Sequence, residues 1–209
     1  MSGIKASRFG FLGVLFFVLS TIFAGFLFLG YSHTAQLISE SYALETAYGF
    51  HLRYFGFLPS GIFLAAFAFF AIRSIPQSKL GKWGFYGLGI FYGIATIIVS
   101  LFPCDTGCNP ELIDPSISQL IHNQTGLLTY LIVPLSLVIL GIAAHKWPGG
   151  KLVSYAGILC GLIALFFVGT LSSEIESDFA GLYQRIIEGS ILLWITLCSF
   201  YLSKKNQPN

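Results

Sequence analysis

Apolar residues are gathered into six long stretches, separated by shorter polar connections. A helix needs roughly 20 apolar residues to cross the hydrocarbon core of a bilayer, so each stretch predicts one transmembrane helix. The first stretch is longer than the apolar core of a signal peptide, and we expect it to be retained. The predicted spans are 9–30, 52–72, 83–102, 126–144, 152–171 and 183–202. The pattern predicts an all-α membrane protein, with one bundle of six transmembrane helices forming a single domain over residues 1–209.

Charged residues separate onto the two sides that these spans define. Of the 11 basic residues, all but Arg53 and Arg185 fall in the terminal segments or in the second and fourth connections. These are Lys5, Arg8, Arg73, Lys79, Lys82, Lys146, Lys151, Lys204 and Lys205. All 9 acidic residues lie in or just below the other three connections. Because basic residues accumulate on the cytoplasmic side of membrane proteins, we expect both termini in the cytoplasm (N-in/C-in) and the acidic connections outside.

The composition supports a membrane environment and excludes some partners. Hydrophobic residues make up 55% of the chain and charged residues 10%, whereas a soluble domain carries about 25% charged residues. Membrane lipids are therefore the expected surroundings of most of the surface. The net charge of +2 gives no reason to expect a nucleic-acid partner.

Two cysteines follow the third span within residues 102–108, on the side expected to be oxidising. A disulfide between Cys104 and Cys108 is favoured, since Gly107 allows a tight turn. Free thiols, or metal ligation with a nearby histidine, are the alternatives. Cys160 and Cys198 lie within spans, where cysteine packs as a small apolar residue.

A larger group of polar residues is expected near the same membrane interface. Its histidines and carboxylates could bind zinc or supply a general acid and base. Their spacing matches no metal-binding motif, so we assign no metal. Interfacial hydrogen bonds and helix caps are the simpler interpretation. The group comprises His33, Glu40, His51, Asp105, His122, Glu174, Gln184, Arg185 and Glu188.

Gln184, Arg185 and Glu188 enter the membrane with the sixth span. Ionisable residues inside a span usually face the bundle interior or a wet cavity, which makes these residues candidates for ligand binding. Arg185 and Glu188 share a helix face and can pair with each other. Arg53, near the start of the second span, could pair with Glu188 or Asp105. A structural ion pair that closes the outer end of the bundle is the alternative.

Ser39 lies between His33 and Glu40, an order that invites a hydrolase interpretation. Proximity in sequence does not orient a nucleophile and a base, and the chain contains no Gly-x-Ser-x-Gly motif. Helix capping by Ser39 or Ser41 is the favoured interpretation.

Two Gly-x-x-x-Gly pairs, Gly89 with Gly93 and Gly157 with Gly161, lie in apolar spans. Such pairs permit close approach of helices. Packing within the chain is the commoner cause, and the face of a homo-oligomer is the alternative.

Four short motifs are carried by the polar connections. They are the segment from Tyr31 to Glu40, which contains the pattern His-x-x-x-x-Ile-Ser-Glu, residues 102–105, His122, and residues 181–185. Together they resemble the prokaryotic membrane-protein family known as domain of unknown function 998. The resemblance implies a six-helix protein of the prokaryotic cytoplasmic membrane, and it implies no activity. It also implies an outer-face polar cluster of His33, Ser39, Glu40, Asp105, His122, Gln184 and Arg185.

The sequence leaves three classes of function open. The first is the binding of a lipid or other amphiphile near the extracytoplasmic face, with Arg185 and His122 at its polar head. The second is a membrane-embedded hydrolase or transferase, with or without a metal, that uses His33, Glu40, Asp105 and His122. The third is an accessory or scaffolding subunit whose partners are other membrane proteins. Transport has less support because the middle of the spans is apolar, and no cofactor is indicated.

Overall fold

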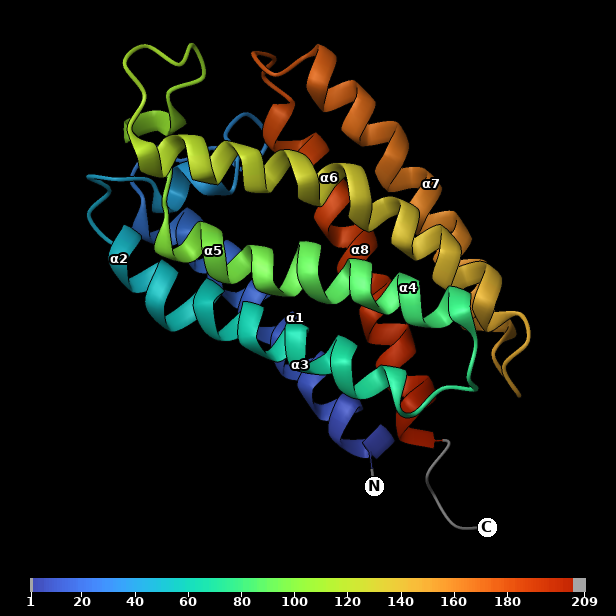
Figure 1. Cartoon of the computed structure of the whole chain (residues 1–209). Helices are drawn as coiled ribbons and strands as arrows, with labels where there is room; N and C mark the ends of the chain where they lie inside the picture. Colours follow the sequence, from blue (N-terminus) through green and yellow to red (C-terminus); the bar gives the residue numbers. More distant parts are fainter. Residues whose placement is uncertain (1, 205–209) are drawn as a thin grey trace.

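The computed structural model describes residues 2–204, which contain helices but no strands (Figure 1). Six helical spans in this part are long and apolar enough to cross a membrane, so the predicted six-helix fold is confirmed. Lys205, which was counted among the basic residues of the C-terminus, lies outside the described residues. Four spans are single helices: α1 (Ser2–Leu27), α6 (Ile117–Ala144), α7 (Lys151–Ser173) and α8 (Ala180–Lys204). The second span is a continuous helix made of α2 (Gly49–Leu52), η2 (Arg53–Phe57) and α3 (Leu58–Ile72). The third is a continuous helix made of α4 (Lys79–Leu88), η3 (Gly89–Ile94) and α5 (Ala95–Leu101).

The six spans form a closed ring in which each packs against the next along the chain, and α8 returns to pack against α1. The two ends of the bundle differ. The terminal end carries the start of α1, the end of α8 and the turns at 73–78 and 145–150. The loop end carries the connections 28–48, 102–116 and 174–179, which include the short helices η1 (Ser39–Tyr42) and η4 (Thr106–Cys108).

Buried aromatic side chains fill the half of the bundle nearest the terminal end. The ring of Phe85 lies 6.0 Å from that of Phe67, 6.0 Å from that of Trp194 and 6.4 Å from that of Trp147, between centroids. Trp194 is fully buried, and its indole N–H donates to the carbonyl of Val153 at 3.1 Å, so its polar edge is satisfied. This half is therefore a packed core.

Glycines bring α6 and α7 together near the turn that joins them. A Cβ atom on Gly157 would lie 2.8 Å from the Cα of Gly141, and one on Gly161 would lie 2.7 Å from the carbonyl oxygen of Pro134. No larger side chain fits at such distances without displacing backbone. Gly93 approaches the backbone of Ala65 in the same way. Both Gly-x-x-x-Gly pairs therefore pack within the chain.

Away from that turn, α6 and α7 diverge towards the loop end (Figure 1). The helix α6 begins at Ile117, well before the predicted start at residue 126. Its first turn is capped by Ser116, whose hydroxyl accepts from the N–H of Gln119 at 3.0 Å. The early turns contain polar residues, which hydropathy does not assign to a span, and Gln119 is fully buried against the connection 102–116.

A π-helical turn interrupts each of the second and third spans. The η2 segment ends just before Pro59, which cannot donate a backbone hydrogen bond to the preceding turn. Such wide turns often occur beside functional sites. Here they place Phe57 and Tyr92 at the centre of the bundle, both buried.

Candidate ligand cavity

A cavity of about 420 Å³ occupies the half of the bundle nearest the loop end. Its volume lies within the range of roughly 300–1,000 Å³ that is typical of small-molecule sites. Most of its walls are apolar or aromatic, and a few polar side chains converge on it from distant parts of the chain. The aromatic rings belong to Phe17, Tyr42, Phe57, Tyr92 and Tyr130. The polar side chains used below are Ser39, His122, Asn123, Gln184 and Glu188.

Glu188 places a carboxyl group deep in this cavity. The residue is 8% exposed, and it lies about 12 Å along α8 from Ala180, given the rise per residue of a helix. Its oxygens accept hydrogen bonds from the hydroxyls of Tyr92 at 2.7 Å and Tyr130 at 3.1 Å. Two tyrosine donors from two other spans therefore hold this carboxyl group in place without a basic partner.

Gln184 extends this arrangement by one turn of α8 towards the loop end. Its amide nitrogen donates to the hydroxyl of Tyr130 at 2.9 Å, and its amide oxygen accepts from the N–H of Ile38 at 2.6 Å. Tyr130 thus accepts from Gln184 and donates to Glu188. The connected hydrogen bonds link the first long connection, α6, α8 and η3 around one cavity.

His122 presents one ring nitrogen to the cavity. The other nitrogen, Nδ1, lies 3.0 Å from the carbonyl oxygen of Phe102. A carbonyl oxygen can only accept, so Nδ1 carries the proton of this hydrogen bond. In the neutral ring, Nε2 is then an acceptor available to a molecule in the cavity.

Arg185 and Glu188 do not pair, and the expected local ion pair is wrong. Glu188 turns towards the bundle interior, whereas Arg185 turns towards the first long connection. There the guanidinium group donates to the carbonyl of Gln36 at 2.9 Å and to the hydroxyl of Tyr31 at 2.6 Å. The carbonyl of Gln36 lies at the loop end of α8, within reach of Arg185, and accepts its hydrogen bond in place of Glu188.

Arg53 likewise has neither of its expected partners. Its Nη1 donates to the carbonyl of Tyr42 at 2.6 Å, which ties η2 to the end of η1. Pairing with Glu188 or Asp105 was wrong because Arg53 lies beside the backbone of the preceding connection. Like Arg185, it is absent from the cavity lining.

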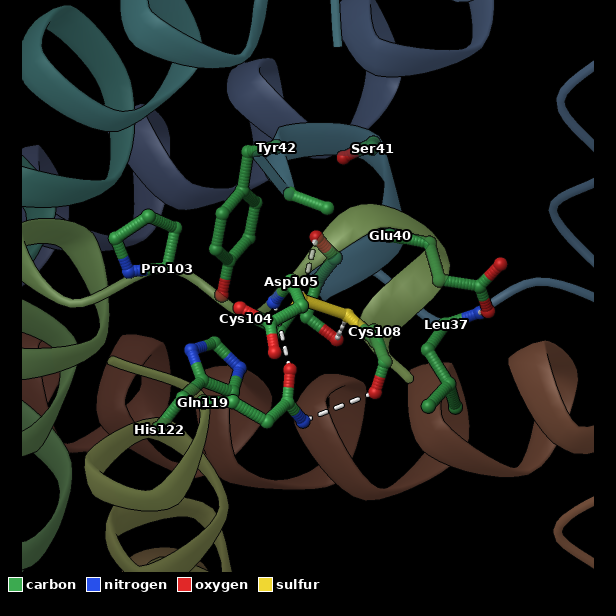
Figure 2. The surroundings of a disulfide bond; sticks show 12 residues. Leu37, Glu40, Ser41, Tyr42, Pro103, Cys104, Asp105, Cys108, Gln119 and His122 are labelled. Atoms are coloured by element: carbon green, nitrogen blue, oxygen red, sulfur yellow. Dashed lines mark hydrogen bonds between the residues drawn. A yellow bond between two sulfur atoms is a disulfide. The ribbon is translucent and has the colours of Figure 1, made fainter. Parts of the chain in front are cut away.

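The connection that contains the disulfide contacts two lining residues, Ser39 and His122, at the loop end. Cys104 and Cys108 form a disulfide, and the hydroxyl of Ser39 lies 3.3 Å from Sγ of Cys108. Because a disulfide sulfur carries no proton, the serine is the donor in this contact. Gln119 reaches up from α6, accepts from the N–H of Asp105 at 2.6 Å and donates to the carbonyl of Cys108 at 2.9 Å (Figure 2).

Asp105 and Glu40 shape the connections rather than line the cavity. Asp105 accepts from the hydroxyl of Ser116 at 2.5 Å and from its N–H at 3.0 Å, and these bonds lower the pKa of the aspartate. Glu40 accepts from the N–H of Leu37 at 2.7 Å and from the side chain of Gln36 at 3.0 Å. Both carboxylates therefore cap local backbone.

His33 lies away from the cavity, exposed, with its ring packed edge-on to Tyr31 at 5.2 Å between centroids. Partial burial, followed by the positive charge of Arg185, lowers the pKa of this histidine. Its position indicates a contact within the first connection rather than a role at the cavity.

The mouth of the cavity lies between the diverging ends of α6 and α7. The lining residues Asn123 and Leu127 of α6, and Ser172 of α7, are exposed there, as is Ile175 just beyond α7. Gly126 lines the same region, and a Cβ atom on it would meet nothing within 4 Å. The cavity therefore opens sideways, between α6 and α7.

The family model described as "Protein of unknown function (DUF998)" matches residues 11–201. The chain belongs to this family. Neither the curated proteins nor the solved structures that were searched gave a match. The DUF998 match covers nearly all of the six spans, so the cavity and the connections at the loop end belong to the family's part of the chain.

In this DUF998 chain, the four residues of the hydrolase or transferase hypothesis have separate partners. His33 packs on Tyr31, while Glu40 and Asp105 cap backbone and His122 bonds to a carbonyl. Among residues 2–204, no three His, Cys, Asp or Glu side chains form a group that could hold a metal ion. The arrangement gives that hypothesis no common site.

Sequence reasoning missed Tyr92, Tyr130 and Gln119. A tyrosine in the middle of an apolar span carries a hydroxyl that needs a partner in the bundle, and Glu188 was the available acceptor. That signal could have linked Tyr92 and Tyr130 to Glu188. Gln119 carried no such signal because it lies outside the predicted spans.

Proposed function

We propose that this membrane protein binds an amphiphilic molecule, taken from the bilayer, in the cavity at its loop end. The observation that carries the proposal is the carboxyl group of Glu188, buried and held by two tyrosines at the wall of a cavity that is otherwise largely apolar. Binding sites commonly combine apolar walls with a few fixed polar groups, which orient the ligand. The polar head of the ligand would lie against Glu188, Gln184 and His122.

The lateral mouth supports entry from the membrane. An apolar tail can stay in contact with lipid between α6 and α7 while the head moves past Gly126 and Leu127 into the bundle. The sequence hypothesis assigned the head group to Arg185 and His122. The proposal keeps His122 and replaces Arg185 by Glu188, because the guanidinium group is already bonded to the first connection.

The proposal includes the orientation that the basic residues predict. With both termini in the cytoplasm, the loop end lies on the extracytoplasmic side, where a disulfide between Cys104 and Cys108 is chemically stable. The cavity would then open to the outer leaflet.

A pair of glycine variants tests the proposal. Gly126→Phe places a ring at the mouth of the cavity, whereas Gly169→Phe adds the same ring on α7 where a Cβ atom also meets open space. Each protein is purified in an uncharged detergent. Native mass spectrometry and thermal unfolding then measure binding across a panel of phospholipids, fatty acids and isoprenoid quinones.

We expect the wild type and Gly169→Phe to retain and be stabilised by at least one member of the panel, and Gly126→Phe to lose that stabilisation. Absence of any bound amphiphile on the wild type, with an unfolding temperature that no lipid changes, would count against the proposal. So would equal binding by both variants.

A further inference from the structure

The charge of the cavity indicates which kind of head group it can accept. Of the described residues that line the cavity, Glu188 alone is an aspartate, glutamate, lysine or arginine. The two nearest arginines are bonded elsewhere, Arg185 to Gln36 and Tyr31 and Arg53 to the carbonyl of Tyr42. The carboxyl group of Glu188 therefore has no basic partner in the cavity, and a cationic head group would supply one.

Aromatic rings line the same cavity as this carboxyl group. The ring of Phe57 lies 5.3 Å from that of Phe17 and 4.7 Å from that of Tyr42, and Phe17 lies 6.2 Å from Tyr92. These rings come from α1, η1, η2 and η3, and together they form one aromatic wall of the cavity. Electron-rich ring faces attract cations, and several such rings together are a recurrent site for ammonium groups.

We infer that the cavity selects amphiphiles with an ammonium head group, which pairs with Glu188 and lies among these aromatic rings. The inference rests on the proposed function and narrows its ligand to one chemical class. A carboxylate offers about four acceptor positions, and the two tyrosine hydroxyls occupy two. The remaining positions can accept N–H donors from a primary ammonium.

Other head groups fit this wall less well. A carboxylate or phosphate head would lie near Glu188 with no guanidinium or lysine in the lining to offset the repulsion. An alcohol can donate one hydrogen bond to Glu188 but gains no charge attraction. A quaternary ammonium lacks N–H donors, and its binding depends on the rings and on the charge of Glu188.

Four probes with the same twelve-carbon tail separate these contributions: dodecylamine, dodecyltrimethylammonium, dodecanol and dodecanoate. Their binding to the full-length protein in an uncharged detergent is measured by native mass spectrometry titration. Glu188→Gln keeps the size of the side chain and one acceptor oxygen for a tyrosine hydroxyl, while it removes the ionisable group. Glu176→Gln removes an exposed charge from the loop near the mouth and is the matched control.

We expect both ammonium probes to bind the wild type about thirtyfold more tightly than dodecanol and dodecanoate, as for a buried charge pair. Glu188→Gln should abolish this preference, and Glu176→Gln should keep it. Phe57→Leu, which removes one ring without adding charge, should weaken dodecyltrimethylammonium more than dodecanol.

Two outcomes separate the head-group inference from the proposed function. Equal binding of all four probes, each blocked by Gly126→Phe, would overturn the ammonium selectivity and leave amphiphile binding in place. Ammonium binding that Glu188→Gln does not weaken would also overturn the selectivity. Failure of every probe to bind the wild type, or binding that Gly126→Phe leaves unchanged, would overturn both proposals.

Discussion

Arg185 in α8 donates a hydrogen bond of 2.6 Å to the hydroxyl of Tyr31, and its Cζ lies 5.5 Å from the centroid of the tyrosine ring. The same guanidinium group donates to the carbonyl of Gln36. Backbone hydrogen bonds add to this attachment. The N–H of Gly181 donates to the carbonyl of Ala35, and the N–H of Leu182 donates to the carbonyl of Thr34. Residues 31–36 therefore cap the start of α8.

Replacing Arg185 should loosen this attachment. Charged hydrogen bonds contribute about 1.5–3 kcal/mol each, so Arg185→Ala should lower the free energy of unfolding by about 2 kcal/mol or more. Thermal unfolding in detergent measures the change. Arg73→Ala, at an exposed arginine just after α3, is the control and should have an effect within about 0.5 kcal/mol. Equal effects of the two substitutions would contradict a specific attachment of the connection to α8.

Gln119 should control how firmly the disulfide loop is held. Gln119→Leu leaves the N–H of Asp105 and the carbonyl of Cys108 without their side-chain partner. We expect a loss of about 1–3 kcal/mol in the free energy of unfolding and faster reduction of the disulfide by dithiothreitol, followed by thiol alkylation. Gln124→Leu, on the exposed part of the same helix, should change neither quantity. An unchanged reduction rate in Gln119→Leu would show that the glutamine does not hold the loop.

Because of Asp105, we expect the folded protein to lose stability in acid. Hydrogen bonds from Ser116 lower the pKa of this carboxyl below its ordinary value, so the ionised group stabilises the folded loop. That contribution is complete above the unfolded pKa of about 4 and disappears as the pH falls through the lower pKa of the folded protein. The difference in unfolding temperature between wild type and Asp105→Asn should therefore be constant above about pH 5 and shrink towards zero in stronger acid. Asp178→Asn, in another exposed connection, is the control; a difference independent of pH would refute the role of the ionised carboxylate.

The orientation of the bundle can be tested with two introduced cysteines. Glu176→Cys lies in the connection 174–179 at the loop end, and Gln77→Cys lies in the turn 73–78 at the terminal end; both positions are exposed. With both termini in the cytoplasm, a membrane-impermeant maleimide should label the cysteine at 176 in intact cells and the cysteine at 77 after permeabilisation alone. The wild type gives the background, because Cys160 and Cys198 are buried. The reverse labelling pattern would invert the proposed topology.

The spans could be predicted because their signal is local. A long apolar stretch predicts a membrane span from its own residues alone, without knowledge of its contacts with the rest of the chain. The three acidic connections were also visible, and they lie together at the loop end of the bundle (Figure 1). The start of α6 was missed because its first turns are stabilised by Ser116 and Gln119, that is, by capping and by contacts with a neighbouring loop.

The cavity could not be predicted because its contacts join distant residues. Tyr92 and Glu188 are 96 residues apart, and Tyr130 and Glu188 are 58 apart. Spacing along a helix shows that Arg185 and Glu188 lie near each other but does not show where their side chains point. The arginine is long enough to reach the backbone at the loop end, whereas the glutamate meets two hydroxyls in the interior. Partner choice therefore depended on tertiary structure.

The packing of α8 against both α7 and α1 has a consequence for how the chain is assembled. Translation delivers α8 last, so the ring stays open while the first five spans are already in the bilayer. During that interval, the carbonyls of Thr34 and Ala35 lack the N–H groups that they later accept from, and Tyr92 and Tyr130 lack the carboxylate that receives their hydroxyls. A chain that ends before residue 180 would therefore leave the hydroxyls of Tyr92 and Tyr130 without this acceptor in the interior of an open bundle.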